Sequence, residues 1–298
     1  MRVFVTGATG FVGTAVVQEL IAAGHQVLGL ARSEASAQKL IDAGAEVQYG
    51  DLQDLDSLRS GAAAADGVIH AGFIHDFTRL PEVCAVDKLA IETIGDVLAG
   101  SNRPFIVTSG SALVSPGKLA TEDIIPPVNP AWPRASEPAA DSVADLGVNA
   151  GVVRLSPSVH GEEDRHGFVP TLVNIAKEKG VSGYVGSGEN RWSAVHRLDA
   201  AKLFRLALEN AAPHARYHAA AEESISVKSI AEAIGKQLGL PVVSIAPEAA
   251  GEHFGWFAHM AAVDCPASSA WTRENLDWEP THSTLLEDIE KGIYTSHL

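Results

Sequence analysis

The segment TGATGFVG, residues 6–13, constrains the fold of this chain more than any other stretch. It follows an apolar run, RVFVT at residues 2–6, and opens an amphipathic stretch that reads as a helix. Gly7 permits a tight turn, Gly10 lets the backbone approach a pyrophosphate, and Gly13 lets the helix pack on the sheet. The free N–H groups at a helix start suit phosphate oxygens. The pattern predicts a dinucleotide-binding turn, and an ordinary glycine turn fits the flanking strand and helix less well.

Short β-rich runs alternate with amphipathic stretches through the first half of the chain. After the first run they occur at residues 26–31, 46–49, 67–71, 104–109 and 151–156. Strands alternating with helices predict parallel pairing with right-handed crossovers. We therefore expect an α/β fold, a Rossmann-type doubly wound parallel sheet.

The pattern is less regular after residue 156. We expect loops at 156–167 and 187–197, with a helix between them, and a helix near 198–210. The chain divides on this basis into an NADP-binding Rossmann domain at 1–156 and a mainly substrate-binding region at 157–298. The helix near 198–210 is expected to pack back on the first domain.

Charge and cysteine content narrow the classes of partner. The 298 residues carry a net charge of −15, which disfavours nucleic acid and anionic membranes as partners. Neither a secretory signal nor an apolar segment of about 20 residues is found. Cys84 and Cys265 are isolated, which is typical of a reducing compartment. We expect a cytoplasmic protein, a monomer or homodimer, that binds a small-molecule substrate.

The end of the second predicted strand, GLARS, bears on the choice of cofactor. Arg32, with Ser33 beside it, can take a 2′-phosphate where an acidic residue would bind the ribose of NAD. A solvated surface arginine is the alternative. The sequence therefore predicts NADP(H), with NAD(H) less favoured. Asp51 and Leu52 are expected at the adenine, and the small residues of IHAG (69–72) would let the backbone approach the cofactor.

In the order of its motifs the chain resembles the extended short-chain dehydrogenase/reductase superfamily, and within it the NAD-dependent epimerase/dehydratase family. The resemblance rests on TGATGFVG, GDL, IHAG, IVTSGSALV and VVRLSPSVHG, and it covers nearly the whole chain. It implies that the loop after VVRLS contacts the nicotinamide. The expected cofactor contacts are Gly7, Thr9, Gly10, Phe11, Val12, Gly13, Arg32, Ser33, Asp51, Leu52, Ala71, Gly72, Thr108, Pro157, Ser158 and Val159.

The chain departs from the family at its catalytic helix. Members carry Tyr-x-x-x-Lys there, but none of the four tyrosines of this chain has a lysine four residues on. The resemblance places the tyrosine position near Arg134, in PRASEPAADS (133–142), and the lysine position near Glu137 or Pro138. The chain is identified as an atypical member that lacks the motif.

Other side chains are candidates for the missing tyrosine's role. Ser109 or Ser111 can donate a hydrogen bond to a carbonyl, although a serine capping the strand end is an equal alternative. Arg134 can stabilise an alkoxide or bind the cofactor ribose, but it cannot supply a proton. His160 titrates in the required range, although a structural histidine is the more common case. These four are the predicted catalytic residues.

Substrate contacts are expected from His75, Arg191 and Trp192, with core packing as the alternative for Trp192. The remaining histidines lack the helical spacing of a zinc site, so no metal is predicted.

Two classes of function fit this pattern. The first is an NADPH-dependent oxidoreductase that reduces the carbonyl, or a similar polarised double bond, of a small and fairly apolar substrate. The second is a non-catalytic NADP(H)-binding sensor or interaction protein that kept the fold and lost the catalytic residues. An NAD-dependent sugar epimerase or dehydratase is less favoured, because Arg32 argues against NAD.

Overall fold

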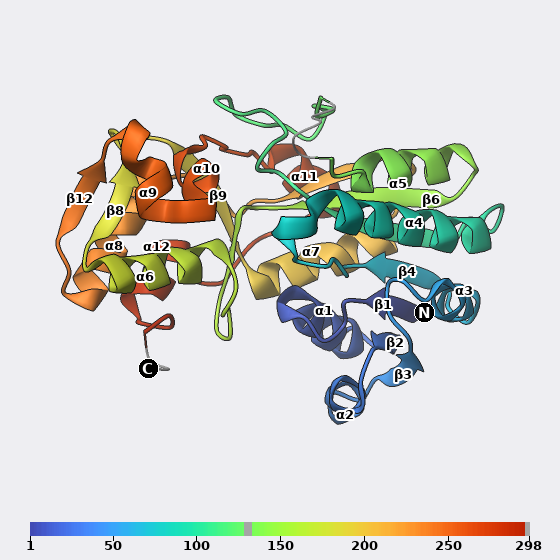
Figure 1. The fold of residues 1–298 in the computed structure, drawn as a ribbon. Coiled ribbons are helices and arrows are strands. Elements are labelled where there is room, and N and C mark those ends of the chain that lie inside the picture. Colours follow the sequence, from blue (N-terminus) through green and yellow to red (C-terminus); the bar gives the residue numbers. More distant parts are fainter. Residues whose placement is uncertain (128–132, 296–298) are drawn as a thin grey trace.

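A seven-stranded parallel sheet forms the centre of the larger of two lobes (Figure 1). The computed structural model describes residues 1–127 and 133–295. The strands lie in the order β10-β6-β5-β4-β1-β2-β3. They span β1 (Arg2–Thr6), β2 (Gln26–Ala31), β3 (Glu46–Tyr49), β4 (Gly67–His70), β5 (Pro104–Gly110), β6 (Asn149–Leu155) and β10 (Arg216–Ala219). This architecture confirms the predicted Rossmann-type α/β fold.

The strand order reverses between β1 and β4, and this is the feature that positions the site. In open α/β sheets, ligands bind outside the carboxyl ends of the strands at such a switch point. The glycine turn after β1 and the IHAG step after β4 therefore lie side by side. Thr6, at the end of β1, is paired in register with His70, at the end of β4.

Helices cover both faces of the sheet. The alternation of β1 side chains decides which helix packs where: Val3 and Val5 face one core cluster and Phe4 faces the other. The first face is covered by α1 (Phe11–Ala22), α2 (Glu34–Asp42) and α7 (Arg197–Glu209). The second is covered by α3 (Leu55–Ala63), α4 (Leu80–Leu98) and α5 (Ser136–Asp145). One 3₁₀ turn, η1 (Phe77–Arg79), precedes α4.

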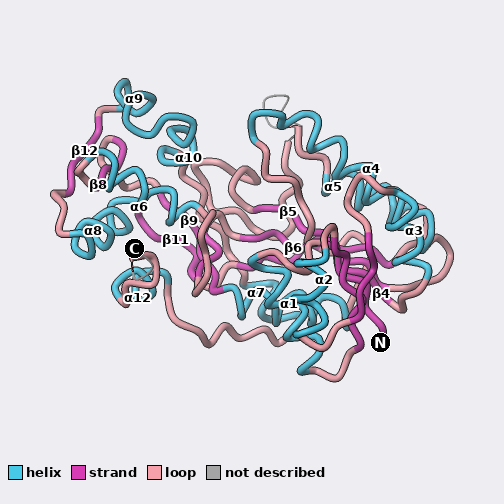
Figure 2. Tube along the Cα trace, turned by 60° about the horizontal axis from the view of Figure 1, so that its bottom comes forward, coloured by secondary structure: helices cyan, strands magenta, loops and turns pink. Residues whose placement is uncertain are grey.

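The smaller lobe lies at one end of the larger (Figures 1 and 2). Its strands are β7 (Ser158–His160), β9 (Arg191–His196) and β11 (Glu222–Ser226) in the order β11-β9-β7, and the parallel pair β8 (Ser182–Val185) and β12 (Val242–Ile245). Its helices include α6 (Phe168–Lys179), α8 (Val227–Leu238), α9 (Ala250–Phe254), α10 (Ala258–Ala262) and α12 (Leu285–Glu290), with 3₁₀ turns η2 (Pro247–Ala249) and η3 (Gly255–Phe257). A further helix, α11 (Ala270–Leu276), stands beside β10 of the larger lobe. None of the helices in the described ranges is long and apolar enough to cross a membrane.

Two expectations about local structure were wrong. The segments expected as loops at 156–167 and 187–197 contain the strands β7 and β9, which pair with each other in parallel. The catalytic-helix segment also begins later than expected, because α5 starts at Ser136. Arg134 therefore lies in the connection that leads into α5, and the helix does not fix its side chain.

Candidate active site

The glycine turn is packed so closely that two of its positions exclude any side chain. Gly7 has φ +66°, and a Cβ there would lie 2.6 Å from the carbonyl oxygen of Ala71 and the nitrogen of Gly72. A Cβ on Gly13 would lie 2.0 Å from the carbonyl oxygen of Gly7. Gly10 differs, because it is exposed with an ordinary φ of −80° and its nearest neighbour would be 3.2 Å away. The turn is therefore closely packed at Gly7 and Gly13, whereas Gly10 is exposed to solvent.

The start of α1 suits a negatively charged group. No side chain caps this helix, and its first turn contains no acidic residue. Its first N–H groups are thus left to a ligand, which fits a pyrophosphate. Thr9 and Phe11 are half-buried on either side of Gly10, and Val12 packs against the core.

One positively charged side chain, that of Arg32, lies at the predicted adenine end of the cofactor site. Arg32 is exposed and forms no ion pair or hydrogen bond with another described residue. Ser33 caps α2, where its hydroxyl accepts a backbone N–H. Asp51 accepts two backbone N–H groups of the turn after β3, at 2.7 and 3.1 Å. Leu52 is half-buried and covers Gly72. Of these residues, Arg32 alone has a polar side chain that bonds to no other described residue.

Two buried hydroxyls mark the predicted nicotinamide end. Thr108 Oγ1 and Ser158 Oγ are buried and have no hydrogen-bond partner among the described residues. A buried hydroxyl without a partner is costly, so both are suited to a ligand. Pro157 and Val159, beside Ser158, are half-buried. These orphaned groups agree with a cofactor at this edge.

Arg134 is held at the carboxyl end of β5. Its Nε donates to Ser136 Oγ at 2.9 Å, and Nη2 donates to the carbonyl oxygen of Thr108 at 3.3 Å. The guanidinium carbon lies 4.5 Å from the centre of the Phe73 ring. Burial lowers the pKa of the Arg134 guanidinium and the charge of Asp87 raises it, but an arginine stays cationic in either case. Its remaining N–H groups bond to no other described residue, so a substrate oxygen can use them.

His75 lies in the same group. Its ring meets that of Phe73 edge to face at 5.4 Å. Burial, and then the charge of Arg134, lower the pKa of His75. The structure thus brings a predicted catalytic residue, a predicted substrate contact and Thr108 together.

The two serines predicted to be catalytic, Ser109 and Ser111, have different hydrogen-bond partners. Ser111 Oγ donates to the carbonyl oxygen of Leu155 at 3.3 Å and lies 3.4 Å from Ser193 Oγ. Ser109 is buried and hydrogen-bonds to Glu137. Both hydroxyls therefore already have partners within the protein.

His160 lies in a separate group at the base of the smaller lobe. Its Nδ1 is 2.8 Å from Asp288 Oδ2, and its buried Nε2 lies 3.9 Å from Glu222 Oε2 without a hydrogen bond. No hydrogen bond, ion pair or ring contact between described residues joins it to Arg134 or to either serine.

The other two residues predicted to contact the substrate, Arg191 and Trp192, also have partners within the protein. Arg191 holds Asp264 through two side-chain hydrogen bonds, at 2.9 and 2.8 Å. Trp192 is 0% exposed and packs against Phe168 and Phe257. Core packing, the alternative weighed for Trp192, accounts for its position.

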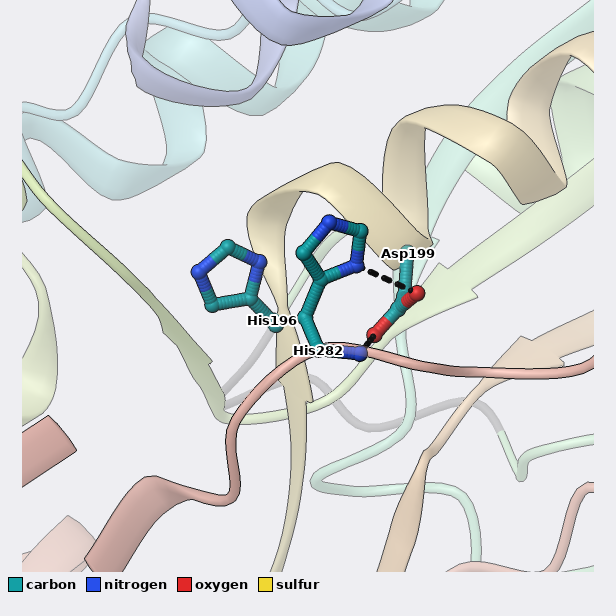
Figure 3. A group of neighbouring side chains, drawn as sticks. All are labelled: His196, Asp199 and His282. Carbon is teal, nitrogen blue, oxygen red and sulfur yellow. Dashed lines mark hydrogen bonds and ion pairs between the residues drawn. The ribbon is translucent and has the colours of Figure 1, made fainter. Parts of the chain in front are cut away.

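One histidine group resembles a metal site at first sight (Figure 3). His196, Asp199 and His282 bring ligand atoms within 4.8 Å of one another. His282 Nδ1 is already bonded to Asp199 at 2.8 Å, and His196 Nδ1 accepts the N–H of Leu198 at 3.3 Å. The two rings are stacked at 9°, so their lone pairs lie in parallel planes and do not converge on one ion. Hydrogen bonding accounts for this group, and the absence of a metal site stays a prediction.

Sequence reasoning missed a buried polar network behind Arg134. His70 and Asp87 are each 1% exposed, and Asp87 is linked through Ser136 to Arg134. The available signal was an aspartate on the apolar face of α4, between Val83 and Ile91. An unpaired buried carboxylate is costly, so it implies partners.

Comparisons with known proteins agree with this geometry. Residues 3–220 match the family model described as "NAD dependent epimerase/dehydratase family". The chain belongs to this family. It is 50% identical over 295 residues to "Uncharacterized protein C2A9.02" of Schizosaccharomyces pombe, covering 99% of this chain and 100% of the relative.

Two proteins with named activities are less similar to this chain. A quinoline-oxide ketoreductase of Stigmatella aurantiaca, "4-hydroxy-2-methyl-3-oxo-4-farnesyl-3,4-dihydroquinoline-1-oxide ketoreductase", is 28% identical over 221 residues, which is 70% of this chain and 65% of the relative. The solved structure of DesIV (dTDP-glucose 4,6-dehydratase) from Streptomyces venezuelae, with NAD and TYD bound, superposes with a TM-score of 0.77. At 18% identity over 98% of this chain and 96% of that chain, DesIV shows a shared fold. The fold of this chain thus also occurs in a dehydratase, and part of its sequence resembles a ketoreductase.

Proposed function

We propose that this member of the epimerase/dehydratase family is an NADPH-dependent oxidoreductase that reduces the carbonyl of a small, fairly apolar substrate. The observation that carries the proposal is the placement of Arg134. Its guanidinium is held by Ser136 and by the Thr108 carbonyl, and its remaining N–H groups bond to no other described residue. A fixed cation with free donors at the carboxyl end of β5 is suited to an oxygen that gains negative charge.

Several groups of the chain would suit NADP(H). The open side of Gly10 and the uncapped start of α1 would take the pyrophosphate, and Arg32 would take the 2′-phosphate. Thr108 and Ser158 would contact the nicotinamide end. When bound, the cofactor supplies the hydride. The preference for NADP over NAD rests on Arg32.

Arg134 is proposed to stabilise the oxyanion that forms on the carbonyl oxygen. It cannot donate a proton, so the alkoxide takes its proton from water or from a neighbouring group. His75 lies beside Arg134, and its lowered pKa keeps it mostly neutral near pH 7. Such an imidazole can orient the substrate or the proton-donating water. Ser109 and Ser111 would contribute less, because their hydroxyls are engaged elsewhere.

We expect the proposed reductase to be slow. Positioning a hydride donor against a bound carbonyl recovers several powers of ten by itself. One well-placed oxyanion donor adds about 10²–10³-fold. The absence of the family's catalytic tyrosine should therefore lower the rate of reduction without abolishing it.

A non-catalytic NADP(H) sensor is the second candidate, and one contact favours it. Glu137, one of the two residues near the predicted lysine position, is paired with Arg154 at 2.7 Å and cannot act as that lysine would. In this reading Arg134 would bind only the cofactor.

NADPH consumption separates the two functions. The purified chain should be incubated with NADPH and a panel of aldehydes and ketones, with Gly10→Val as the control that cannot hold the cofactor. We expect substrate-dependent consumption in the wild type and none in the control. NADPH binding without turnover of any carbonyl would replace the reductase with the sensor.

A further inference from the structure

A continuous path of buried hydrogen bonds joins the glycine turn to Arg134. The Gly72 N–H donates to Thr6 Oγ1 at 3.2 Å, and Thr6 Oγ1 lies 2.9 Å from His70 Nδ1. His70 Nε2 lies 3.2 Å from Asp87 Oδ1. Thr6, His70 and Asp87 are each at most 1% exposed. The first half of the path therefore ends on a buried carboxylate.

The second half leaves the other oxygen of that carboxylate. Ser136 Oγ donates to Asp87 Oδ2 at 2.6 Å, and Arg134 Nε donates to Ser136 Oγ at 2.9 Å. Ser136 is 0% exposed. The two oxygens of Asp87 thus join the two halves of the path, one through His70 and the other through Ser136.

The direction of the bonds between Arg134, Ser136 and Asp87 is fixed by their chemistry. Since Arg134 Nε–H can only donate, Ser136 must accept from it and give its own hydrogen to Asp87. On the other side, the contacts are satisfied together when the Thr6 hydroxyl donates to His70 Nδ1. His70 then donates its Nε2–H to Asp87. The carboxylate accepts from both sides, and the path has no unpaired hydrogen.

The carboxylate of Asp87 is buried between His70 and Ser136, and Arg134 is linked to it through Ser136. Burial alone would raise the pKa of the Asp87 carboxyl, but the hydrogen bond and the charge of His70, then the charge of Arg134 and the hydrogen bond from Ser136, hold that pKa below its usual range. A buried ion of this kind is generally not stabilising compared with an apolar side chain. Its presence on the apolar face of α4 therefore points to a role beyond packing.

We propose that Asp87 is the positioning residue for Arg134, acting through Ser136. The function of the positioned guanidinium rests on the proposed reductase activity, but the positioning itself does not. Through His70 and Thr6 the same carboxylate is bonded to the turn that would hold the pyrophosphate. The cofactor side and the oxyanion side of the site are thus one hydrogen-bonded unit.

Hydrogen exchange at Arg134 tests the positioning without any substrate. In protein labelled with ¹⁵N-arginine, the Nε–H signal that disappears in Arg134→Lys belongs to Arg134. Its exchange with water should be slow in the wild type and about tenfold faster in Asp87→Asn and Ser136→Ala, the loss of about 1.4 kcal/mol expected for one charged hydrogen bond. Thr93→Val, which alters another buried polar residue of α4, should leave it unchanged.

Unchanged exchange in folded Asp87→Asn would overturn the proposal. Should that variant not fold, Ser136→Ala decides: exchange as slow as in the wild type would show that the path does not hold the guanidinium.

Kinetics test what the positioning does for the reaction. With a carbonyl that the wild type reduces, Asp87→Asn should lower kcat about tenfold while KM for NADPH stays within about twofold. In the Arg134→Lys background the same change should have little further effect, because both replacements remove one interaction. Additive losses, or a loss confined to KM, would contradict the proposal. If the wild type reduces no carbonyl, the reductase proposal fails, and the exchange measurement still decides the role of Asp87.

Discussion

Glu137 and Arg154 form a two-bond ion pair inside the larger lobe. Arg154 Nε donates to Oε1 at 2.9 Å, and Nη2 donates to Oε2 at 2.7 Å. Burial alone would raise the pKa of the Glu137 carboxyl, but Arg154, with Ser109 and Arg216, holds that pKa below its usual range. The position expected for a lysine near the cofactor ribose is occupied by an anion that binds inward.

Glu137→Ala should therefore destabilise the protein and leave the cofactor site intact. The replacement leaves Arg154, which is 0% exposed, without its carboxylate, and such a loss costs about 3–5 kcal/mol. Urea unfolding measures it, with Glu137→Ala/Arg154→Met as the matched double variant, whose loss should be smaller than the sum of the single losses. A stable Glu137→Ala protein with weakened NADPH binding would instead make Glu137 a cofactor residue.

Gly10→Val should abolish cofactor binding in a folded protein. The backbone at Gly10 suits any residue, but a valine side chain would occupy the path of the pyrophosphate. Gly251→Val, at an open position of the smaller lobe, is the control and should bind NADPH as the wild type does. Titration of NADPH fluorescence measures both. Tight binding by Gly10→Val would refute the assignment of the glycine turn.

Arg32→Asp should reverse the cofactor preference. The replacement removes the partner of the 2′-phosphate and adds repulsion, so NADPH affinity should fall by more than about 1.5 kcal/mol and below NADH affinity. Dissociation constants for both cofactors measure the change. Equal affinity of the wild type for NADH and NADPH would show that Arg32 does not select the cofactor.

His196 should make the protein less stable in acid. Burial, and then the charge of His160, lower the pKa of His196 to about 4, from about 6.5 in an unfolded chain. Between those values the unfolded chain binds a proton that the folded protein does not, so the free energy of unfolding falls as the pH drops from about 6.5 to about 4.

His196→Asn keeps a side chain that can cap α7 and removes the titrating group. Between pH 6.5 and 4.5 the wild type should lose on the order of 2 kcal/mol more than the variant. Urea unfolding across this range is the measurement. Parallel stability curves would mean that His196 does not carry the acid sensitivity.

The main sheet was predictable because its signals are local. The strand β2 coincides with the apolar run at residues 26–31, and β3 with the β-rich run at residues 46–49. Parallel strands buried on both faces read as continuous apolar runs, which a sequence displays directly. The strands β7 and β9 give no such signal, because they are set by pairing with each other across more than 30 residues of chain.

The site was predictable only in part, for the same physical reason. Gly7 and Gly13 are required by close contacts within a short segment and its neighbouring strand, and the spacing of the motif reports them. The bond between Ser136 and Asp87 joins residues 49 positions apart and leaves no pattern in either segment. Counting along the sequence from the next strand was enough to predict that Arg134 lies near the tyrosine position. The residues that bond to Arg134 could not be predicted in this way.

The rate of carbonyl reduction by Arg134→Met tests the central claim most directly. The variant removes the guanidinium from the carboxyl end of β5 and keeps a long apolar side chain over Phe73. With a substrate that the wild type reduces, kcat should fall about 10²–10³-fold while NADPH affinity stays close to that of the wild type, because the lost donor acts on the charge that develops in the transition state. A variant that reduces the same substrate at the wild-type rate would contradict the account.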